Sequence, residues 1–253
     1  MIKPVKFLID ITGHSTYLVG STLFASLFLP IVIVANILKL YKVSSFLMYV
    51  SLAFFVRKVL GFLRVIKIDE IRGTEQIKTV ATAVYVCNHR GKLDGPLIMS
   101  LVKNIKPTMK TKYARRPLFR LFVRWFGFCE IDLKTNTGLL NTEKKIADIL
   151  KEQNILIFPE GTRKYSNRLT EFKNMAFKIA IRNNKPIVPV IIHDNIPFMT
   201  KNLASFFPME TVKYNIHFLA PVDSGGKTAE KLKNEVYEMM SERLREITSS
   251  CSE

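Results

Sequence analysis

The sequence predicts an α/β protein, with a mixed sheet flanked by helices and a hydrophobic two-helix membrane segment at its N-terminus. The chain has 253 residues, 48% of them hydrophobic, so it can build one large core. After residue 64, runs rich in β-branched and aromatic residues alternate with stretches of helical periodicity, which is typical of α/β domains. We therefore predict a membrane-associated helical hairpin over residues 1–63 and an α/β domain over residues 64–253.

Two apolar runs make up the predicted hairpin. Tyr17–Leu38 carries no charged side chain, and a helix of that length rises roughly 33 Å, about the thickness of a bilayer's hydrocarbon core. Pro30 would kink that helix. Ser44–Phe55 is shorter and is followed by Arg57 and Lys58, a pattern typical of a helix in the membrane interface. We favour a membrane-embedded hairpin or a monotopic anchor; a full span, a buried pair of core helices and a cleaved signal peptide are the alternatives.

The elements of the α/β domain follow from two periodicities. Strands are expected in the apolar runs at 65–73, 79–87, 154–158, 186–192 and 212–220. Helices are expected at 96–102, 137–152, 172–182 and 227–247. The last helix places six apolar side chains on one face, while its opposite face is charged and solvated: Leu232, Val236, Met239, Met240, Leu244 and Ile247.

Charge and cysteine usage limit the classes of partner. The formal net charge is +17, which indicates an anionic partner such as nucleic acid, an acidic lipid surface or a phosphorylated substrate. No zinc finger, basic-region heptad or RNA-recognition signature occurs, so nucleic acid is unsupported. Cys87, Cys129 and Cys251 are far apart, which indicates a reducing compartment without a disulfide framework or metal spacing.

The first motif is VYVCNHRGKLDGP, Val84 to Pro96. An apolar run ends, and His89 and Asp94 follow. Imidazole can take a proton near neutral pH, and a carboxylate on one ring nitrogen fixes the tautomer and stabilises the imidazolium. A catalytic base with its orienting carboxylate is one interpretation. The alternative is a turn in which Asp94 caps a helix that Pro96 helps to start.

The sequence offers no obvious covalent nucleophile. There is no G-x-S-x-G elbow, and Cys87 ends an apolar strand, where a buried core residue is expected. A base without a protein nucleophile indicates activation of the substrate's own hydroxyl.

The second motif is ILIFPEGTRKYS, Ile155 to Ser166. Gly161 permits unusual backbone dihedrals, and successive N–H groups of such a turn can form a nest for an anion. Arg163 adds a planar fork suited to phosphate. The alternative is an ordinary charged turn with a surface pair between Glu160 and Arg163.

Together, NHRGKLD and FPEGTR, in this order and at this separation, resemble the motifs of the glycerolipid acyltransferases. The resemblance runs from about Val84 to Val190 and includes several further positions: Lys110, Pro117, Gly127, Ile131, Asp132 and the VPV of Val188–Val190. The chain departs from the family at Leu133, where arginine is usual, and at Met175, where glycine is usual. These departures bear on acceptor preference.

The resemblance implies a reaction. A fatty acyl group would pass from acyl-CoA or acyl carrier protein to the 2-hydroxyl of lysophosphatidic acid, giving phosphatidic acid in phospholipid biosynthesis. His89 would deprotonate that hydroxyl, and Asp94 would hold the imidazole. The alternatives are a related acyltransferase for another lysophospholipid or glycerol 3-phosphate, and a non-enzymatic membrane-surface protein.

The resemblance also implies a binding site without a metal or a covalent cofactor. Lys110 and Arg163 would bind the acceptor's phosphate, and Glu160, Gly161 and Thr162 would shape the same pocket. Residues 64–253 would then be an acyltransferase domain. The expected partners are anionic membrane lipid, lysophosphatidic acid and the acyl donor, with no nucleic acid. The expected location is the inner membrane, with the catalytic domain on its cytoplasmic face.

Overall fold

The structure is a computed structural model that describes residues 19, 27, 30–35, 37–38, 41–62, 65–116, 120, 128–132, 135–200 and 210–250. Much of the apolar run Tyr17–Leu38 lies outside these residues, as do Pro117, Gly127, Leu133 and Cys251. Within the described ranges, no helix combines the length and the apolar character needed to cross a bilayer.

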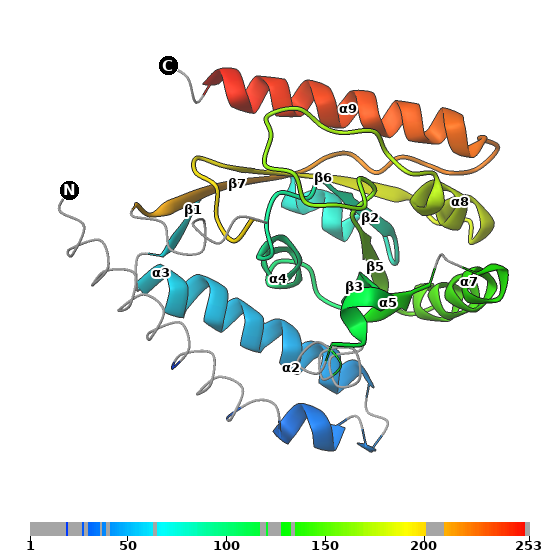
Figure 1. Cartoon of the computed structure of the whole chain (residues 1–253), viewed down its shortest axis with the longest axis horizontal. Helices are drawn as coiled ribbons and strands as arrows, with labels where there is room; N and C mark the ends of the chain where they lie inside the picture. Colours follow the sequence, from blue (N-terminus) through cyan, green and yellow to red (C-terminus); the bar gives the residue numbers. More distant parts are fainter. Residues whose placement is uncertain are drawn as a thin grey trace.

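The described residues form one seven-stranded sheet with the order β1-β7-β6-β2-β5-β3-β4 (Figure 1). The strands are β1 Ile66–Arg72, β2 Val84–Cys87, β3 Ile105–Lys110, β4 Cys129–Ile131, β5 Asn154–Ile157, β6 Ile187–Asp194 and β7 Val212–Phe218. Neighbouring strands are parallel except for the antiparallel pair β6 and β7. The predicted mixed sheet is therefore confirmed.

The strand register decides which loops meet. Strands β2, β5 and β6 run the same way, so the segments after Cys87 and Ile157 and the end of β6 lie at one edge of the sheet. Because β7 is antiparallel to β6, its start lies at this edge too, with Tyr214 opposite Asp194. Strand β1 runs parallel to β7, and Ile66 is opposite Val212. The carboxyl ends of parallel strands are where α/β proteins bind ligands.

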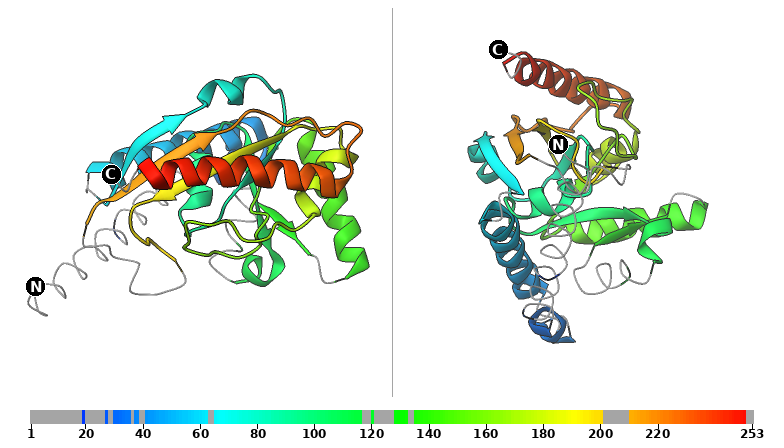
Figure 2. Two further views of the ribbon diagram at one scale, coloured as in Figure 1. Left: turned by 90° about the horizontal axis from the view of Figure 1, so that it is seen from above. Right: turned by 60° about the vertical axis from the view of Figure 1, so that its left-hand side comes forward.

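Helices cover both faces of the sheet (Figures 1 and 2). One face packs against α2 Tyr41–Ala53, the π-helix η1 Phe54–Val59, α3 Leu60–Phe62 and α4 Asp94–Met99. The other packs against α7 Asn136–Leu150, α8 Met175–Arg182 and α9 Ala229–Ser250. The short η2 Thr74–Lys78 follows β1, and α5 Thr111–Ala114 follows β3. Alternate side chains of β2 serve the two cores, because successive strand residues point to opposite faces.

The helical segment formed by α2, η1 and α3 packs against this core. Met48 of α2, Val56 of η1 and Leu60 of α3 are buried in the same cluster as the sheet residues. On another side of α2, Phe46 is 51% exposed and Val50 is 39% exposed. This helical segment therefore packs against the domain and also presents apolar side chains outward.

The observed elements match the predicted ones in type and differ in their bounds. All five predicted strand runs contain a strand, but β3 and β4 were not expected. The helix predicted at 96–102 begins at Asp94 and ends at Met99, and the one predicted at 172–182 begins at Met175. In α9, five of the six predicted core side chains are buried and Met239 is partly buried.

The two adjacent methionines of α9 provide a test of this packing. Met240 is 0% exposed, so Met240→Ala should lower the free energy of unfolding by about 2–5 kcal/mol through lost burial and a cavity. Met239→Ala should cost less than half as much, since Met239 is only partly buried. Urea unfolding followed by circular dichroism measures both. Equal costs would contradict the observed face of α9.

Candidate active site

His89 and Asp94 meet directly after β2. The distance from His89 Nδ1 to Asp94 Oδ2 is 2.8 Å. The Asp94 side chain is 1% exposed, whereas that of His89 is 21% exposed. The same carboxylate oxygen accepts the backbone N–H of Arg90 at 2.7 Å and of Gly91 at 2.9 Å. A carboxylate held in this way accepts the Nδ1–H of the ring and leaves Nε2 unprotonated to act as a base.

The helix-cap interpretation of Asp94 is wrong. Asp94 is the first residue of α4, the N-cap position is Leu93, and no side chain caps this helix. The reason is geometric: the carboxylate faces back toward the preceding loop, where one oxygen serves His89 and two backbone N–H groups.

Phe158 stacks on the imidazole of His89. The two ring centroids are 4.0 Å apart and the rings are inclined by 20°. Phe158 directly follows β5 and is the first residue of the FPEGTR motif. The stacking fixes one face of the imidazole while the carboxylate fixes its edge. The sequence analysis missed this role, although an aromatic residue at the end of a parallel strand next to β2 is a usable signal.

Glu160 joins the two motif loops. Its side chain is buried, and Oε1 accepts the backbone N–H of His89 at 2.9 Å. Oε2 accepts the backbone N–H of Thr170 at 3.1 Å and also its hydroxyl. A second link runs the other way, from the N–H of Lys164 to the carbonyl of His89 at 2.8 Å. Because both oxygens of Glu160 bond to the protein, this residue shapes the site by positioning its loops.

The Gly161 turn lies beside Lys110. Gly161 has φ +66°, a left-handed conformation that favours glycine, and a Cβ there would come within 3.2 Å of the Lys173 side chain. Lys110 ends β3 and donates from Nζ to the Gly161 carbonyl at 2.6 Å. Thr162 is exposed and Arg163 is partly buried. The structure thus places Lys110 and the FPEGTR turn together, as the resemblance implies.

Lys92 adds a cation that the sequence analysis missed. Burial lowers the pKa of Lys92, and the positive charge of Arg163 lowers it further. The two cations are therefore close enough to repel each other, and Lys110 lies at the same turn. An anion placed between such groups would relieve the repulsion. The available signal was that Lys92 lies inside the first motif, between His89 and Asp94.

A buried arginine connects the loop that carries His89 (residues 88–94) to two further segments. Arg90 is 1% exposed and forms an ion pair with Asp194 at the end of β6. It also donates to the Ser166 carbonyl at 2.5 Å and lies 4.4 Å from the centre of the Tyr165 ring. Burial raises the pKa of Asp194 to about 6, and the neighbouring charge of Arg90 opposes this rise.

Cys87 is a core residue, as the sequence predicts. Its side chain is 0% exposed. Burial raises the pKa of this thiol well above its usual value, with smaller contributions from the charges of Asp94 and Glu160. A thiol kept protonated and away from solvent is not a nucleophile.

Comparison with known proteins fits this geometry. The acyltransferase family model matches residues 69–193, a range that contains both motifs and therefore His89 and Asp94. Residues 69–193 thus match the acyltransferase family. The resemblance drawn from the motifs is thereby confirmed.

Individual members of the acyltransferase family are similar over different lengths. A 1-acyl-sn-glycerol-3-phosphate acyltransferase of Cocos nucifera is 31% identical over 66% of this chain and 53% of its own length. One of Haemophilus influenzae is 27% identical over 70% of this chain and 75% of its own. The chain thus spans about half the length of the coconut protein. The crystal structure of the 1-acyl-sn-glycerophosphate (LPA) acyltransferase PlsC of Thermotoga maritima has the same fold, with a TM-score of 0.71, 20% identity and coverage of 95% of this chain and 98% of that chain.

Two glycines of the acyltransferase site provide a matched test of its packing. A Cβ on Gly91 would lie 2.5 Å from the Phe198 carbonyl oxygen, whereas one on Gly95 would have nothing within 4 Å. Gly91→Ala must therefore shift the loop that holds Asp94, and we expect acyl-transfer turnover to fall at least ~10-fold, since displacements of about 1 Å cost up to 10²-fold. Gly95→Ala, in α4, should keep the turnover and the melting temperature. Equal turnover in the two folded variants would contradict the tight packing at Gly91.

Proposed function

We propose that this protein is a 1-acylglycerol-3-phosphate O-acyltransferase. It transfers a fatty acyl group from acyl-CoA or acyl carrier protein to the 2-hydroxyl of lysophosphatidic acid and so forms phosphatidic acid. The observation that carries the proposal is the imidazole of His89, held at 2.8 Å by the buried carboxylate of Asp94 beside a turn with several cations. The names of the relatives from Cocos nucifera and Haemophilus influenzae support the acceptor.

The chemistry is a direct transfer. Nε2 of His89 takes the proton of the acceptor's hydroxyl while that oxygen forms a bond to the thioester carbonyl carbon. The carbon–sulfur bond then breaks, and the leaving thiolate takes the proton from the imidazolium. Asp94 stabilises the imidazolium between these two steps. The proposal requires no metal, no covalent cofactor and no acyl-enzyme.

The acceptor's phosphate binds at the Gly161 turn. Arg163 supplies a planar guanidinium and Lys110 a point charge, and Lys92 adds a second ammonium from the base loop. Lys110 is already oriented toward this turn through its bond to the Gly161 carbonyl at 2.6 Å. Glu160 holds the turn against the base loop, so the phosphate site and the base keep a fixed spacing.

The reaction is expected at the cytoplasmic face of the inner membrane, with the N-terminal apolar segment as the anchor. The net charge of +17 supports this placement, because anionic lipid, acceptor and donors all attract a basic protein. Exposed apolar side chains on α2 support it as well.

His89→Ala tests the base. Turnover of labelled lysophosphatidic acid in detergent micelles, with acyl-CoA and acyl carrier protein supplied separately, should fall at least ~10²-fold, the lower range for a lost general base. Asp94→Asn should also be severe. Its amide oxygen can still accept backbone N–H groups, but a neutral amide cannot stabilise the imidazolium. Near-native turnover in a folded His89→Ala protein would rule out the mechanism.

Arg163→Ala tests the acceptor site. Losing one charged hydrogen bond typically costs roughly 1.5–3 kcal/mol, or about one to two powers of ten in affinity. The KM for lysophosphatidic acid should therefore rise ~10–100-fold while the KM for the thioester changes little. Arg163→Lys should recover only part of the affinity, because an ammonium cannot form the bidentate fork.

Two results would show that Arg163 does not bind the acceptor. If only the KM for the thioester rises, Arg163 binds the donor instead. If no kinetic constant changes, Arg163 is a surface residue without a role in binding. Assays with glycerol 3-phosphate and other lysophospholipids, run in parallel, separate the proposed acceptor from the related alternatives that Leu133 and Met175 raise.

A further inference from the structure

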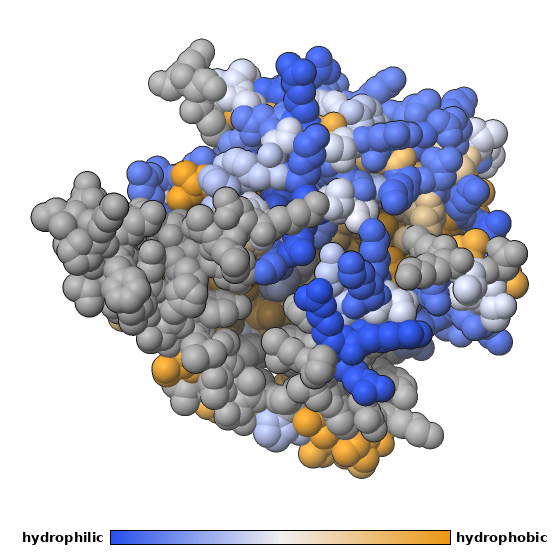
Figure 3. Space-filling model, in the orientation of Figure 1, coloured by the Kyte–Doolittle hydropathy of each residue, from blue (hydrophilic) through white to orange (hydrophobic). Residues whose placement is uncertain are grey.

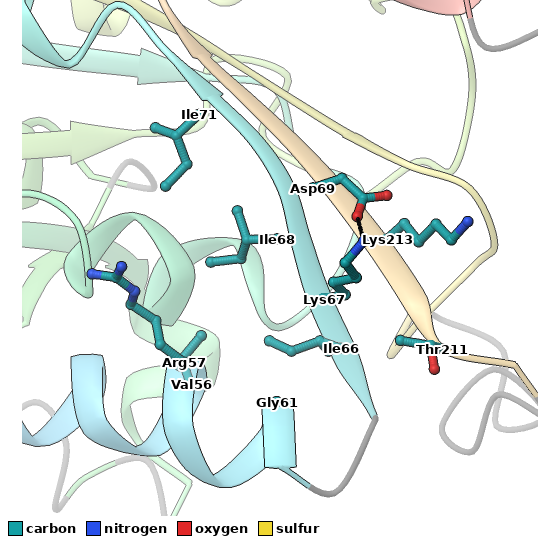
Figure 4. Close-up of a pocket in the computed structure, with 10 residues that line it drawn as sticks. All are labelled: Val56, Arg57, Gly61, Ile66, Lys67, Ile68, Asp69, Ile71, Thr211 and Lys213. Carbon is teal, nitrogen blue, oxygen red and sulfur yellow. Dashed lines mark ion pairs between the residues drawn. The ribbon is translucent and has the colours of Figure 1, made fainter.

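Many charged side chains of this basic protein lie at its surface, where they make the region around α9 hydrophilic (Figure 3). Lys67 and Asp69, which line the pocket drawn in Figure 4, form a surface ion pair with Nζ and Oδ1 2.6 Å apart. Their side chains are 66% and 29% exposed, and pairs of this kind contribute little to stability. The pair of Arg90 with Asp194 is different, because its side chains are only 1% and 2% exposed.

The guanidinium of Arg90 holds two other segments at once. Nε pairs with the carboxylate of Asp194, and Nη2 donates to the carbonyl of the same residue at 3.3 Å. Nη1 donates to the carbonyl of Ser166 at 2.5 Å. The Tyr165 ring packs on the guanidinium, 4.4 Å from Cζ to the ring centre, and its hydroxyl donates to the Asp194 carbonyl at 3.3 Å. One side chain therefore joins the end of β6 to residues 165–166.

These contacts require an arginine and not only a positive charge. A guanidinium is a planar fork with several N–H donors, whereas an ammonium is a compact point charge. A buried ion pair is weak evidence for stability, because apolar side chains of similar volume often stabilise a fold equally well. The reason for burying Arg90 is therefore to be sought in the segments that it positions.

The segment held by Arg90 follows Arg163 directly. Before Arg163, the Gly161 carbonyl accepts a hydrogen bond from Lys110 Nζ at 2.6 Å. After it, the Ser166 carbonyl accepts the hydrogen bond from Arg90. The chain is thus fixed on both sides of the guanidinium that is proposed to bind the acceptor's phosphate.

Arg90 is also part of the loop that carries the proposed base. It follows His89 in the chain, and its backbone N–H donates to the Asp94 carboxylate at 2.7 Å. The carbonyl of His89 accepts the N–H of Lys164 at 2.8 Å. The backbone of Arg90 therefore belongs to the loop of the base, while its side chain holds the segment that follows Arg163.

We infer that Arg90, with Asp194 as its counterion, is a positioning residue that sets where Arg163 stands relative to His89. The inference rests on the proposed function, in which Arg163 binds the acceptor's phosphate. Without the fork of Arg90, Arg163 keeps its charge but loses its fixed place, so the acceptor gains little from it. The effects of changing Arg90 and Arg163 should then overlap, whereas the effects of independent sites add in free energy.

A double-mutant cycle on the full chain in detergent micelles tests this coupling. Its members are Arg90→Lys, Arg163→Ala and the double variant, and Arg90→Lys keeps the charge while removing the fork. The matched control replaces Arg90→Lys by Arg182→Lys. Arg182 of α8 pairs with Glu143 of α7, and its side chain is 58% exposed. Kinetic constants are measured for lysophosphatidic acid and for the thioester, and urea unfolding of every variant is followed by circular dichroism.

Arg90→Lys should raise the KM for lysophosphatidic acid ~10-fold, as expected for one lost charged hydrogen bond, and should leave the KM for the thioester nearly unchanged. In the Arg90→Lys protein, adding Arg163→Ala should raise the KM for lysophosphatidic acid by no more than ~3-fold, because coupled residues are not additive. In the Arg182→Lys protein, Arg163→Ala should keep its full effect. If the Arg90 and Arg163 factors multiply, or if the control shows the same overlap, the inference is overturned.

Hydrogen exchange provides a measurement that needs no turnover. Backbone amides of residues 164–166 should exchange at least ~10-fold faster in Arg90→Lys than in the wild type, since their segment loses an anchor, and should be unchanged in Arg182→Lys. Asp194→Asn, which removes the counterion, should show the same change and serves as the second variant if Arg90→Lys does not fold. Unchanged exchange would overturn the inference. A wild type that does not acylate lysophosphatidic acid would instead refute the proposed function, so the two failures are distinguishable.

Discussion

The active site depends on one buried carboxylate. Asp94 is 1% exposed and uses a single oxygen to accept three N–H groups, from the ring of His89 and from the backbone of the next two residues. Burying a charge is costly unless it is paired and hydrogen-bonded, so the loop must take the shape that supplies these donors. The same requirement selects the ring tautomer that leaves Nε2 unprotonated, as the proposed mechanism needs. The fold and the chemistry thus follow from one set of hydrogen bonds.

The other contacts of the site hold this loop relative to the rest of the sheet. Glu160 ties it to the segment at Thr170, and Arg90 ties it to the end of β6. Each of these side chains is buried, and each bridges segments that follow different strands. Removing one partner of a buried charged pair leaves the other uncompensated. Positioning and stability are therefore coupled in this region, and kinetic tests need variants whose folding is measured at the same time.

The sequence was sufficient to predict the strands and helices that have strong local signals. β2 is a continuous apolar run, β6 is apolar from Ile187 to Ile192, and α9 has a clear 3.6-residue periodicity, so these two strands and this helix were predictable. β3 was missed because IKPTMK combines a proline with two lysines, and only its pairing with β5 and β4 identifies it as a strand. The predicted bounds of α4 were wrong because the helix begins at Asp94, whose carboxylate bonds to the preceding loop, and ends at Met99.

The roles of individual residues divide in the same way, into those that local spacing predicts and those that only the tertiary fold reveals. The pairing of His89 with Asp94 could be proposed because the two residues are only five positions apart in the sequence, directly after an apolar strand. The partnership of Arg90 with Asp194 could not, because the two are 104 residues apart and meet only through the order of the strands. Glu160 was placed in the substrate pocket by resemblance, whereas its contacts show that it connects loops.

The tautomer of His89 tests the central claim most directly. The chain contains four histidines, so ¹⁵N-labelled histidine in detergent micelles gives a small set of ring signals, and the His89→Ala variant identifies the one of interest. The account predicts that neutral His89 carries its proton on Nδ1, with Nε2 unprotonated. A signal showing the proton on Nε2 would contradict it, because the ring would then face the Asp94 carboxylate with a lone pair and could not act as the base.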